Sequence, residues 1–141
     1  MKLLLLLPFL LLAGCTSQQA YFCHLDDCSA VVIKEIAAAK KSVVFATYTF
    51  TEPSIGTAVI LAHMNGISVK GIIEKRNINA ESSQYQRFLE QGVDVKPDNN
   101  SALMHHKFFV IDNSIVITGS FNPTKAADES NDDNLVVIRN K

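Results

Sequence analysis

The stretch MHHKFFVIDNSIVITGSFN, residues 104–122, decides the fold and also carries most of the polar chemistry. It contains two runs rich in β-branched and aromatic residues, 105–112 and 115–118, which are typical of buried strands. The residues between them, Asp112–Ser114, are a tight-turn signal. The stretch therefore predicts a β-hairpin whose strands bear histidine, lysine, serine and asparagine among apolar residues.

The polar side chains of this hairpin are expected to gather on one face. Residues two apart in a strand share a face, so His105 and Lys107 point the same way, while His106 points the other way. On the return strand, Ser120 and Asn122 share a face by the same rule. A tight hairpin then brings an imidazole, an ammonium, a hydroxyl and an amide close together.

This set of groups suits a phosphodiester. The lysine provides a fixed positive charge and the serine and asparagine provide donors, as a tetrahedral oxyanion requires. An imidazole attacks phosphorus as a nucleophile or relays a proton near neutral pH. Because Lys107 supplies the charge that Mg²⁺ supplies in other enzymes, we expect no metal and no other cofactor.

Six residues of this stretch stand at fixed spacings in the pattern His105-x-Lys107-x4-Asp112-x6-Gly119-Ser120-x-Asn122. It resembles the HKD motif of the phospholipase D superfamily, and the flanking residues 37–75 and 118–138 resemble single-motif members. The resemblance covers about residues 21–138 and is nearest to small bacterial secreted endonucleases. It implies a phospholipase D/nuclease-like fold.

The resemblance also implies a role for each motif residue. His105 would be the nucleophile that forms a phosphohistidine, and Lys107 and Asn122 would bind phosphate oxygens with help from Ser120. The leaving oxygen would take a proton from a second histidine. Because the chain has one copy of the motif, that histidine would be His105 of another subunit in a twofold homodimer.

Two aspartates complete the implied set. In the superfamily a downstream carboxylate orients the ring of the histidine, and the matching position here is Asp133, where relatives commonly carry glutamate. Asp132 and Glu129 are possible substitutes for it. Asp112 belongs to the motif but sits at the turn, so we expect it to fix the hairpin rather than to touch substrate.

The rest of the chain predicts one α/β domain with a mixed β-sheet flanked by helices on both faces. Ser29 is the expected N-cap of the first helix, and Tyr48 and Phe50 are expected in the core. A polar connector is expected over 123–133. The predicted helices are 30–41, 54–64 and 84–91, and the predicted strands are 42–50, 68–75, 93–96, 105–112, 115–118 and 134–138.

The N-terminus resembles a bacterial lipoprotein signal. Lys2 precedes the apolar run 3–12, which is too short to span a membrane, and small residues precede Cys15. We expect a signal peptide over 1–14, a lipidated Cys15 with a polar tether over 15–20, and a catalytic domain over 21–141. The alternative is a plain signal peptide; the lipoprotein interpretation implies an enzyme anchored in the bacterial envelope, periplasmic or on the outer surface.

The two other cysteines, Cys23 and Cys28, lie in CHLDDC. Outside the cytoplasm a local disulfide is the natural pairing, with a zinc site or free thiols as alternatives. The formal net charge of −1 provides no global basic field of the kind that non-specific nucleic-acid binders show. Any nucleic-acid contact must therefore rest on a local patch.

Three functions remain in competition. The first is a metal-independent, non-specific endonuclease acting on DNA or RNA; the second is a phospholipase D acting on membrane phospholipids. The third is a non-catalytic DNA-binding protein at the cell surface, which would have no use for a nucleophile. The resemblance also implies a further C-terminal amphipathic helix, which either follows Lys141 or is replaced by cover from a partner.

Overall fold

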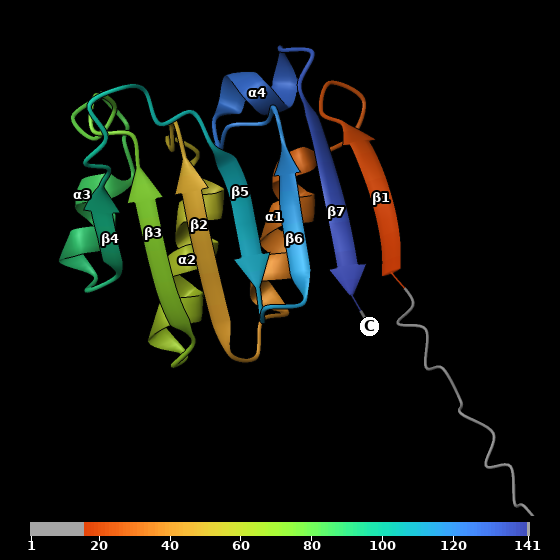
Figure 1. Ribbon diagram of the computed structural model, residues 1–141, viewed down its shortest axis with the longest axis horizontal. Helices are drawn as coiled ribbons and strands as arrows, with labels where there is room; N and C mark the ends of the chain where they lie inside the picture. Colours follow the sequence, from red (N-terminus) through yellow and green to blue (C-terminus); the bar gives the residue numbers. More distant parts are fainter. Residues whose placement is uncertain (1–15, 141) are drawn as a thin grey trace, which may run out of the picture.

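The computed structural model describes residues 16–140, so the expectations for residues 1–14 and for Cys15 lie outside the described residues. Seven strands form one mixed sheet in the order β1-β7-β6-β5-β2-β3-β4, drawn in Figure 1. The expectation of a single α/β domain built on a mixed sheet is confirmed. The strands are β1 (Thr16–Phe22), β2 (Ser42–Thr47), β3 (Ser68–Ile73), β4 (Asp94–Pro97), β5 (Lys107–Ile111), β6 (Ile115–Gly119) and β7 (Asn134–Asn140).

The sheet changes direction at strand β5. Strands β2, β3 and β4 run parallel to one another, as βαβ connections require. Strand β5 inserts antiparallel beside β2, and β6, β7 and β1 continue the antiparallel order from there. The predicted 105–118 hairpin is therefore present as the pair β5–β6 and occupies the middle of the sheet.

Helices α1 and α2 pack against one face of this sheet, behind it in Figure 1, and α4 lies beyond the upper strand ends. One buried cluster joins Ile36 of α1, Val59 of α2 and Phe88 of α3 to Phe45 and Phe109 of the strands. The helices are α1 (Cys28–Ala37), α2 (Pro53–Met64), α3 (Tyr85–Glu90) and α4 (Lys125–Glu129). None of these helices in residues 16–140 is both long enough and apolar enough to cross a bilayer.

The opposite face of the sheet remains open along its centre. Val44 and Ile72 are 40% and 44% exposed there, although each lies on an interior strand of the sheet. The expected helical layer on this second face is not formed by residues 16–140, because their helical segments all contribute to the same buried cluster. The sheet is thus half-covered within the described part of the chain.

Two local expectations near α1 and α4 need correction. Helix α1 is capped by Asp27, not Ser29: the Asp27 carboxylate accepts a hydrogen bond from the Ala30 N–H at 2.7 Å. The expected polar connector 123–133 contains α4, whose first turn is capped by Thr124. This short helix forms because its buried Ala127 packs into the same core as the longer helices.

Residues 16–20, expected as a tether, form most of strand β1. This strand pairs antiparallel with β7 over its full length, from Thr16 opposite Asn140 to Phe22 opposite Asn134. Its side chains are almost all exposed, so the apolar pattern that marks a core strand is missing. Main-chain hydrogen bonds provide most of the attachment of this edge strand, and of its residues only Tyr21 packs against the core, which explains why side-chain patterning did not predict it.

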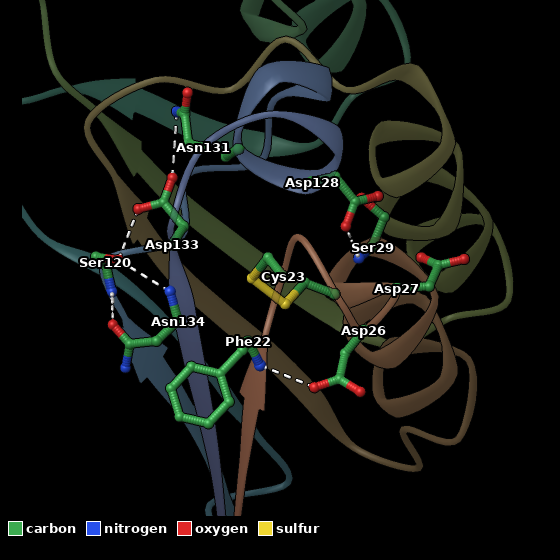
Figure 2. Close-up of a disulfide and its surroundings, with 12 residues drawn as sticks. Phe22, Cys23, Asp26, Asp27, Ser29, Ser120, Asp128, Asn131, Asp133 and Asn134 are labelled. Atoms are coloured by element: carbon green, nitrogen blue, oxygen red, sulfur yellow. Dashed lines mark hydrogen bonds between the residues drawn. A yellow bond between two sulfur atoms is a disulfide. The ribbon is translucent and has the colours of Figure 1, made fainter.

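The disulfide between Cys23 and Cys28 is present, and both cysteines are buried. It joins the end of β1 to the first residue of α1, so it connects the edge of the sheet to the helical layer (Figure 2). The predicted pairing is confirmed. In residues 16–140, no three side chains of the His, Cys, Asp or Glu type are placed to share a metal ion.

Asp112 holds the β5–β6 turn against the connection between α1 and β2. Asp112 and Asn113 have φ angles of 52° and 56°, as expected for a tight hairpin turn. The Asp112 carboxylate accepts hydrogen bonds from the N–H groups of Lys40, Lys41 and Ser42 at 2.8, 2.7 and 2.9 Å. The aspartate of the motif is therefore a structural residue that fixes where β5 ends.

Removing the disulfide should destabilise the domain. A cross-link over so short a loop lowers the entropy of the unfolded chain by an amount worth about 2 kcal/mol. We expect the double variant Cys23→Ala, Cys28→Ala to lose about 2 kcal/mol of unfolding free energy in urea. Dithiothreitol should lower the stability of the wild type equally and leave the variant unchanged; a wild type indifferent to reduction would contradict the prediction.

Asp112→Asn should destabilise the fold in a pH-dependent manner. Burial acts to raise the pKa of Asp112, but the N–H donors of Ser42, Lys40 and Lys41 outweigh it, and the pKa lies below the usual 3.8. A carboxyl with a lowered folded pKa stabilises the fold above its unfolded pKa, and the stabilisation disappears as the pH falls through the folded value. We expect a loss of about 1–3 kcal/mol at neutral pH.

Urea unfolding across a pH series measures this difference. The gap between wild type and Asp112→Asn should shrink steadily once the pH drops below about 4. Asp94→Asn is the matched control, because Asp94 is an exposed carboxylate paired only with Lys96. A constant gap down to strongly acidic pH would show that the charge of Asp112 is not what stabilises the turn.

Candidate active site

His105 and Lys107 lie against the same aromatic ring. His105 precedes strand β5, and its exposed imidazole has its ring centroid 4.6 Å from that of Tyr48. The Lys107 ammonium lies 5.2 Å from the centroid of the Tyr48 ring and donates to the main-chain oxygen of His105 at 3.0 Å. The half-buried tyrosine therefore brings the imidazole and the ammonium to one place.

Ser120 is fixed between the end of β6 and the start of β7. Its Oγ donates to Asp133 Oδ1 at 2.6 Å and accepts from the Asn134 N–H at 3.0 Å, as Figure 2 shows. The preceding Gly119 is needed for this approach, because a Cβ there would lie 2.2 Å from the Asn134 carbonyl oxygen. The serine hydroxyl is thus held in a defined orientation before any substrate arrives.

Asn122 is joined to the same place through the residue that follows Tyr48. Its Oδ1 accepts a hydrogen bond from the Thr49 N–H at 3.3 Å. The Tyr48 N–H in turn donates to the His106 carbonyl oxygen at 2.9 Å. Residues 48–49 therefore lie between the histidine segment and Asn122, and the asparagine NH₂ keeps two donors that no acceptor in residues 16–140 takes up.

Asp133 does not make the contact that the resemblance implies. Within the described residues its carboxylate accepts from Ser120 Oγ and from Asn131 Nδ2, at 2.6 and 3.3 Å, and makes no hydrogen bond to His105. The short aspartate side chain reaches the nearby hydroxyl instead of the imidazole. In this arrangement Asp133 orients Ser120.

Asp133 also acts on Lys107 through its charge. Partial burial lowers the pKa of Lys107 below its usual 10.5, and the negative charge of Asp133 opposes that change. The ammonium therefore stands in a partly desolvated position next to an aspartate that favours its protonated form. A partly desolvated cation attracts an anionic phosphate more strongly than a fully hydrated one.

The remaining motif and histidine residues lie elsewhere. Asp112 is at the far end of β5 from Lys107, bound to the N–H groups of residues 40–42. The ring of His106 packs edge-on against Phe108, with centroids 6.0 Å apart. The structure thus brings together His105, Lys107, Ser120, Asn122 and Asp133, and leaves Asp112 outside the site.

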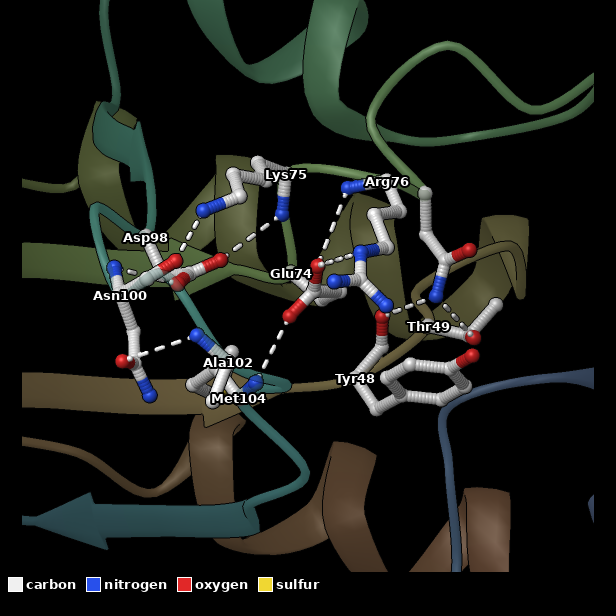
Figure 3. A network of polar contacts seen from close by, with 10 residues as sticks. Tyr48, Thr49, Glu74, Lys75, Arg76, Asp98, Asn100, Ala102 and Met104 are labelled. Atoms are coloured by element: carbon white, nitrogen blue, oxygen red, sulfur yellow. Dashed lines mark hydrogen bonds and ion pairs between the residues drawn. The ribbon is translucent and has the colours of Figure 1, made fainter.

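Sequence reasoning missed three residues that surround the site. Tyr48, expected in the core, is half-buried and forms the surface under His105 and Lys107. Glu74 follows strand β3 and accepts a hydrogen bond from the Met104 N–H, as drawn in Figure 3. Asn77, in the same turn, donates to the Tyr48 carbonyl oxygen. Their positions just after the parallel strands β2 and β3 could have predicted them, because ligand-binding residues of α/β sheets gather there.

The chain is similar in sequence and in structure to several known proteins. The family described as cardiolipin synthase, PLD-like domain, matches residues 32–141. The crystal structure of Nuc, a phospholipase D family member from Salmonella typhimurium, superimposes with a TM-score of 0.83 at 34% identity. That similarity covers 89% of this chain and 84% of the Nuc chain.

Two curated relatives extend the comparison. Mitochondrial cardiolipin hydrolase from Xenopus tropicalis is 34% identical over 114 residues, which are 81% of this chain and 54% of that protein. Phospholipase D from Rickettsia typhi is 32% identical over 114 residues, covering 81% and 56%. The chain spans about half the length of these relatives. The family match over most of the sequence confirms the resemblance of the HKD motif, and the chain belongs to the PLD-like domain family of the phospholipase D superfamily.

Proposed function

We propose that this protein is a metal-independent endonuclease that hydrolyses phosphodiester bonds of DNA or RNA through a phosphohistidine intermediate. The observation that carries the proposal is the placement of His105 and Lys107 against the ring of Tyr48, with Asn122 hydrogen-bonded to the next residue, Thr49. A nucleophile, a cation and an amide donor are thereby adjacent. His105 is exposed, and an open site of this kind accommodates a polymer that extends beyond it on both sides.

The proposed reaction has two displacements at phosphorus. An imidazole nitrogen of His105 attacks the phosphodiester, the bond to the leaving oxygen breaks, and a second histidine gives that oxygen a proton. Water then attacks the phosphohistidine while the second histidine, now neutral, accepts the proton of the water. The P–N bond breaks, His105 is regenerated, and the products are a phosphomonoester and an alcohol.

The other site residues stabilise the charge that builds up on phosphorus. Lys107 places its ammonium beside the phosphate oxygens, and the NH₂ group of Asn122 donates to one of them. The hydroxyl hydrogen of Ser120 is donated to Asp133, so the hydrogen bonds to the phosphate come from Lys107 and Asn122. Because Lys107 carries the positive charge, the proposed reaction needs no metal ion.

We infer that the second histidine comes from a second copy of the chain. The other histidines of the described residues are engaged elsewhere: His106 packs on Phe108, His24 Nδ1 lies 3.4 Å from the Glu129 oxygen, and His63 belongs to α2. A twofold axis beside His105 would place two identical imidazoles across one phosphate. A homodimer would therefore provide the nucleophile and the acid with one motif per chain.

The proposed location is the bacterial cell envelope. The leader over 1–14 and Cys15 support export followed by lipid anchoring. The buried disulfide between Cys23 and Cys28 supports an oxidising compartment, because such bonds persist outside the cytoplasm. An enzyme held at this location would meet external nucleic acid.

A phospholipase D activity is the second candidate, and one observation favours it. Phe22 and Leu25 are 62% and 84% exposed and line a hollow together with Asp132 and Asp133. Exposed apolar side chains next to Asp133 would suit contact with acyl chains at a membrane surface. The nucleic-acid and phospholipid substrates share the same diester chemistry, so only a direct assay separates them.

His105→Ala should abolish hydrolysis because it removes the nucleophile. We expect the purified protein to degrade plasmid and single-stranded DNA in excess EDTA, and the variant to be slower by roughly 10³-fold or more. His106→Ala is the matched control and should keep most of the activity, since its ring faces Phe108. Rapid acid-free quenching with labelled substrate should trap a phosphorylated wild-type chain but no phosphorylated His105→Ala.

The same samples test the alternatives. Release of choline from phosphatidylcholine vesicles, with no loss of DNA, would favour a phospholipase D. DNA retention without turnover would favour a binding protein. Loss of activity in EDTA would contradict the metal-free mechanism, and a fully active species that sediments as one chain would contradict the shared site.

Asp133→Asn should lower the pH at which Lys107 loses its proton. Asp133 opposes the lowering of the Lys107 pKa by burial, so removing its charge lets that pKa fall further. The asparagine still offers an oxygen to Ser120, which keeps the local geometry. The measurement is the ¹³C NMR titration of Lys107 Cε, with Asp132→Asn, an exposed neighbour, as control; an unchanged or higher titration midpoint would refute the assignment.

A further inference from the structure

The main chain on both sides of His105 is held by hydrogen bonds to residues outside strand β5. Strand β5 begins at Lys107, so His105 itself precedes the regular ladder. Two hydrogen bonds flank it: the Met104 N–H donates to Glu74 Oε2 at 2.8 Å, and the His106 carbonyl oxygen accepts from the Tyr48 N–H at 2.9 Å. The first of these depends on a side chain, and that side chain is Glu74.

Glu74 is a fully buried carboxylate. Its exposed fraction is 0%, and its second oxygen accepts from the Arg76 N–H at 3.3 Å and lies 3.7 Å from Arg76 Nε (Figure 3). Burying a carboxylate is costly, and an apolar residue of similar size commonly serves stability as well or better. A buried charge at the end of β3, bonded to the residue before His105, points to a positioning role beyond packing.

The same turn also holds the tyrosine on which His105 lies. The Asn77 N–H donates to the Glu74 carbonyl oxygen at 2.9 Å, and its side-chain Nδ2 donates to the Tyr48 carbonyl oxygen at 2.7 Å and to Thr49 Oγ1 at 3.1 Å. One turn, residues 74–77, is therefore bonded both to the chain before His105 and to the chain that carries the Tyr48 ring.

The chain between β4 and Met104 is tied to this turn as well. Asp98 accepts from the Lys75 N–H and from the Asn100 N–H, each at 2.9 Å, and Lys75 Nζ donates to the Asn100 carbonyl oxygen. The segment 98–104, which leads to His105, is thus hydrogen-bonded to residues 74–77 at several points. The attachment ends at Met104, whose side chain is buried.

We propose that Glu74 is a positioning residue for His105: its buried carboxylate, through Met104 N, fixes the imidazole against Tyr48 in the orientation for attack on phosphorus. Asn77 fixes the tyrosine side of the same contact. This inference rests on the proposed phosphodiesterase function for its catalytic consequence. The placement of the His105 ring, however, is measurable without any substrate.

The test compares Glu74→Gln with Glu35→Gln. Glu35 is the matched control, because it is also a buried carboxylate, 6% exposed, and is paired with an arginine, Arg139, at 2.6 Å. It ties α1 to β7, away from the Tyr48–His105 contact. Both substitutions replace a buried carboxylate by a neutral amide that still has one oxygen acceptor. Both should therefore lower the midpoint temperature of thermal unfolding.

Only Glu74→Gln should change the surroundings of His105. In ¹H–¹³C NMR spectra, the His105 ring resonances carry the ring-current shift of Tyr48, and we expect them to move in Glu74→Gln while those of His24 and His63 stay. With bis(p-nitrophenyl) phosphate as substrate, we expect kcat to fall about 10- to 100-fold with KM within about twofold. Glu35→Gln should keep both the His105 resonances and kcat.

Unmoved His105 resonances in folded Glu74→Gln would overturn the proposal, as would an equal movement in Glu35→Gln. If Glu74→Gln fails to fold, Asn77→Ala takes its place: it removes the bonds to Tyr48 and Thr49 and should move the same resonances, with a smaller loss of kcat. A wild type inactive on every diester would refute the proposed function, and the resonances would still decide the positioning role.

Discussion

The pairing of β2 with β5 is the constraint on which the site depends. Thr47, the last residue of β2, lies opposite Lys107, the first residue of β5. This register makes Tyr48 meet His106 immediately beyond the ladder, and it places the tyrosine ring under both His105 and Lys107. A slip of one residue would turn every side chain of β5 to the opposite face and separate the imidazole from the ring. The buried Phe109 and Ile111, which face the helices, oppose such a slip with the free energy of their burial.

The mixed direction of the sheet explains why several strands deliver polar groups to one edge. The parallel strands β2 and β3 end where the antiparallel β5 begins, so Tyr48, Glu74 and His105 are neighbours. Strand β6 ends at the same edge, and Ser120 follows it there. An all-parallel sheet would gather only carboxyl ends, whereas here His105, the proposed nucleophile, comes from the amino end of β5. The far edge, where Asp112 binds the N–H groups of residues 40–42, is left to fix the length and position of the hairpin.

The sequence was most informative where residue type and spacing act locally. The spacing of the HKD pattern on a β-hairpin predicted which groups come together, because strand alternation and a tight turn depend only on nearby residues. It did not predict strand β1, which is attached by main-chain bonds that any side chain permits. It placed Tyr48 in the core, because an aromatic residue after a buried strand usually packs there. The residues near Tyr48 in the sequence do not show that the ring of the distant His105 lies against it. Glu74 was missed for the same reason: its partner, Met104, is thirty residues away in sequence and is reached through its main chain.

Strand alternation also bears on why the chain brings one imidazole, and not two, to the proposed site although it carries two adjacent histidines. Consecutive residues of an extended segment point to opposite sides, so the ring of His106 lies against Phe108 while the ring of His105 lies against Tyr48. The two rings therefore do not meet at one place in this structure. The proposed reaction, which uses a nucleophile on one side of phosphorus and an acid on the other, is therefore consistent with a site shared with a second copy of the chain. In a symmetric dimer no additional residue would be needed. The register of β2 and β5 that positions His105 in one copy would position His105 in the other.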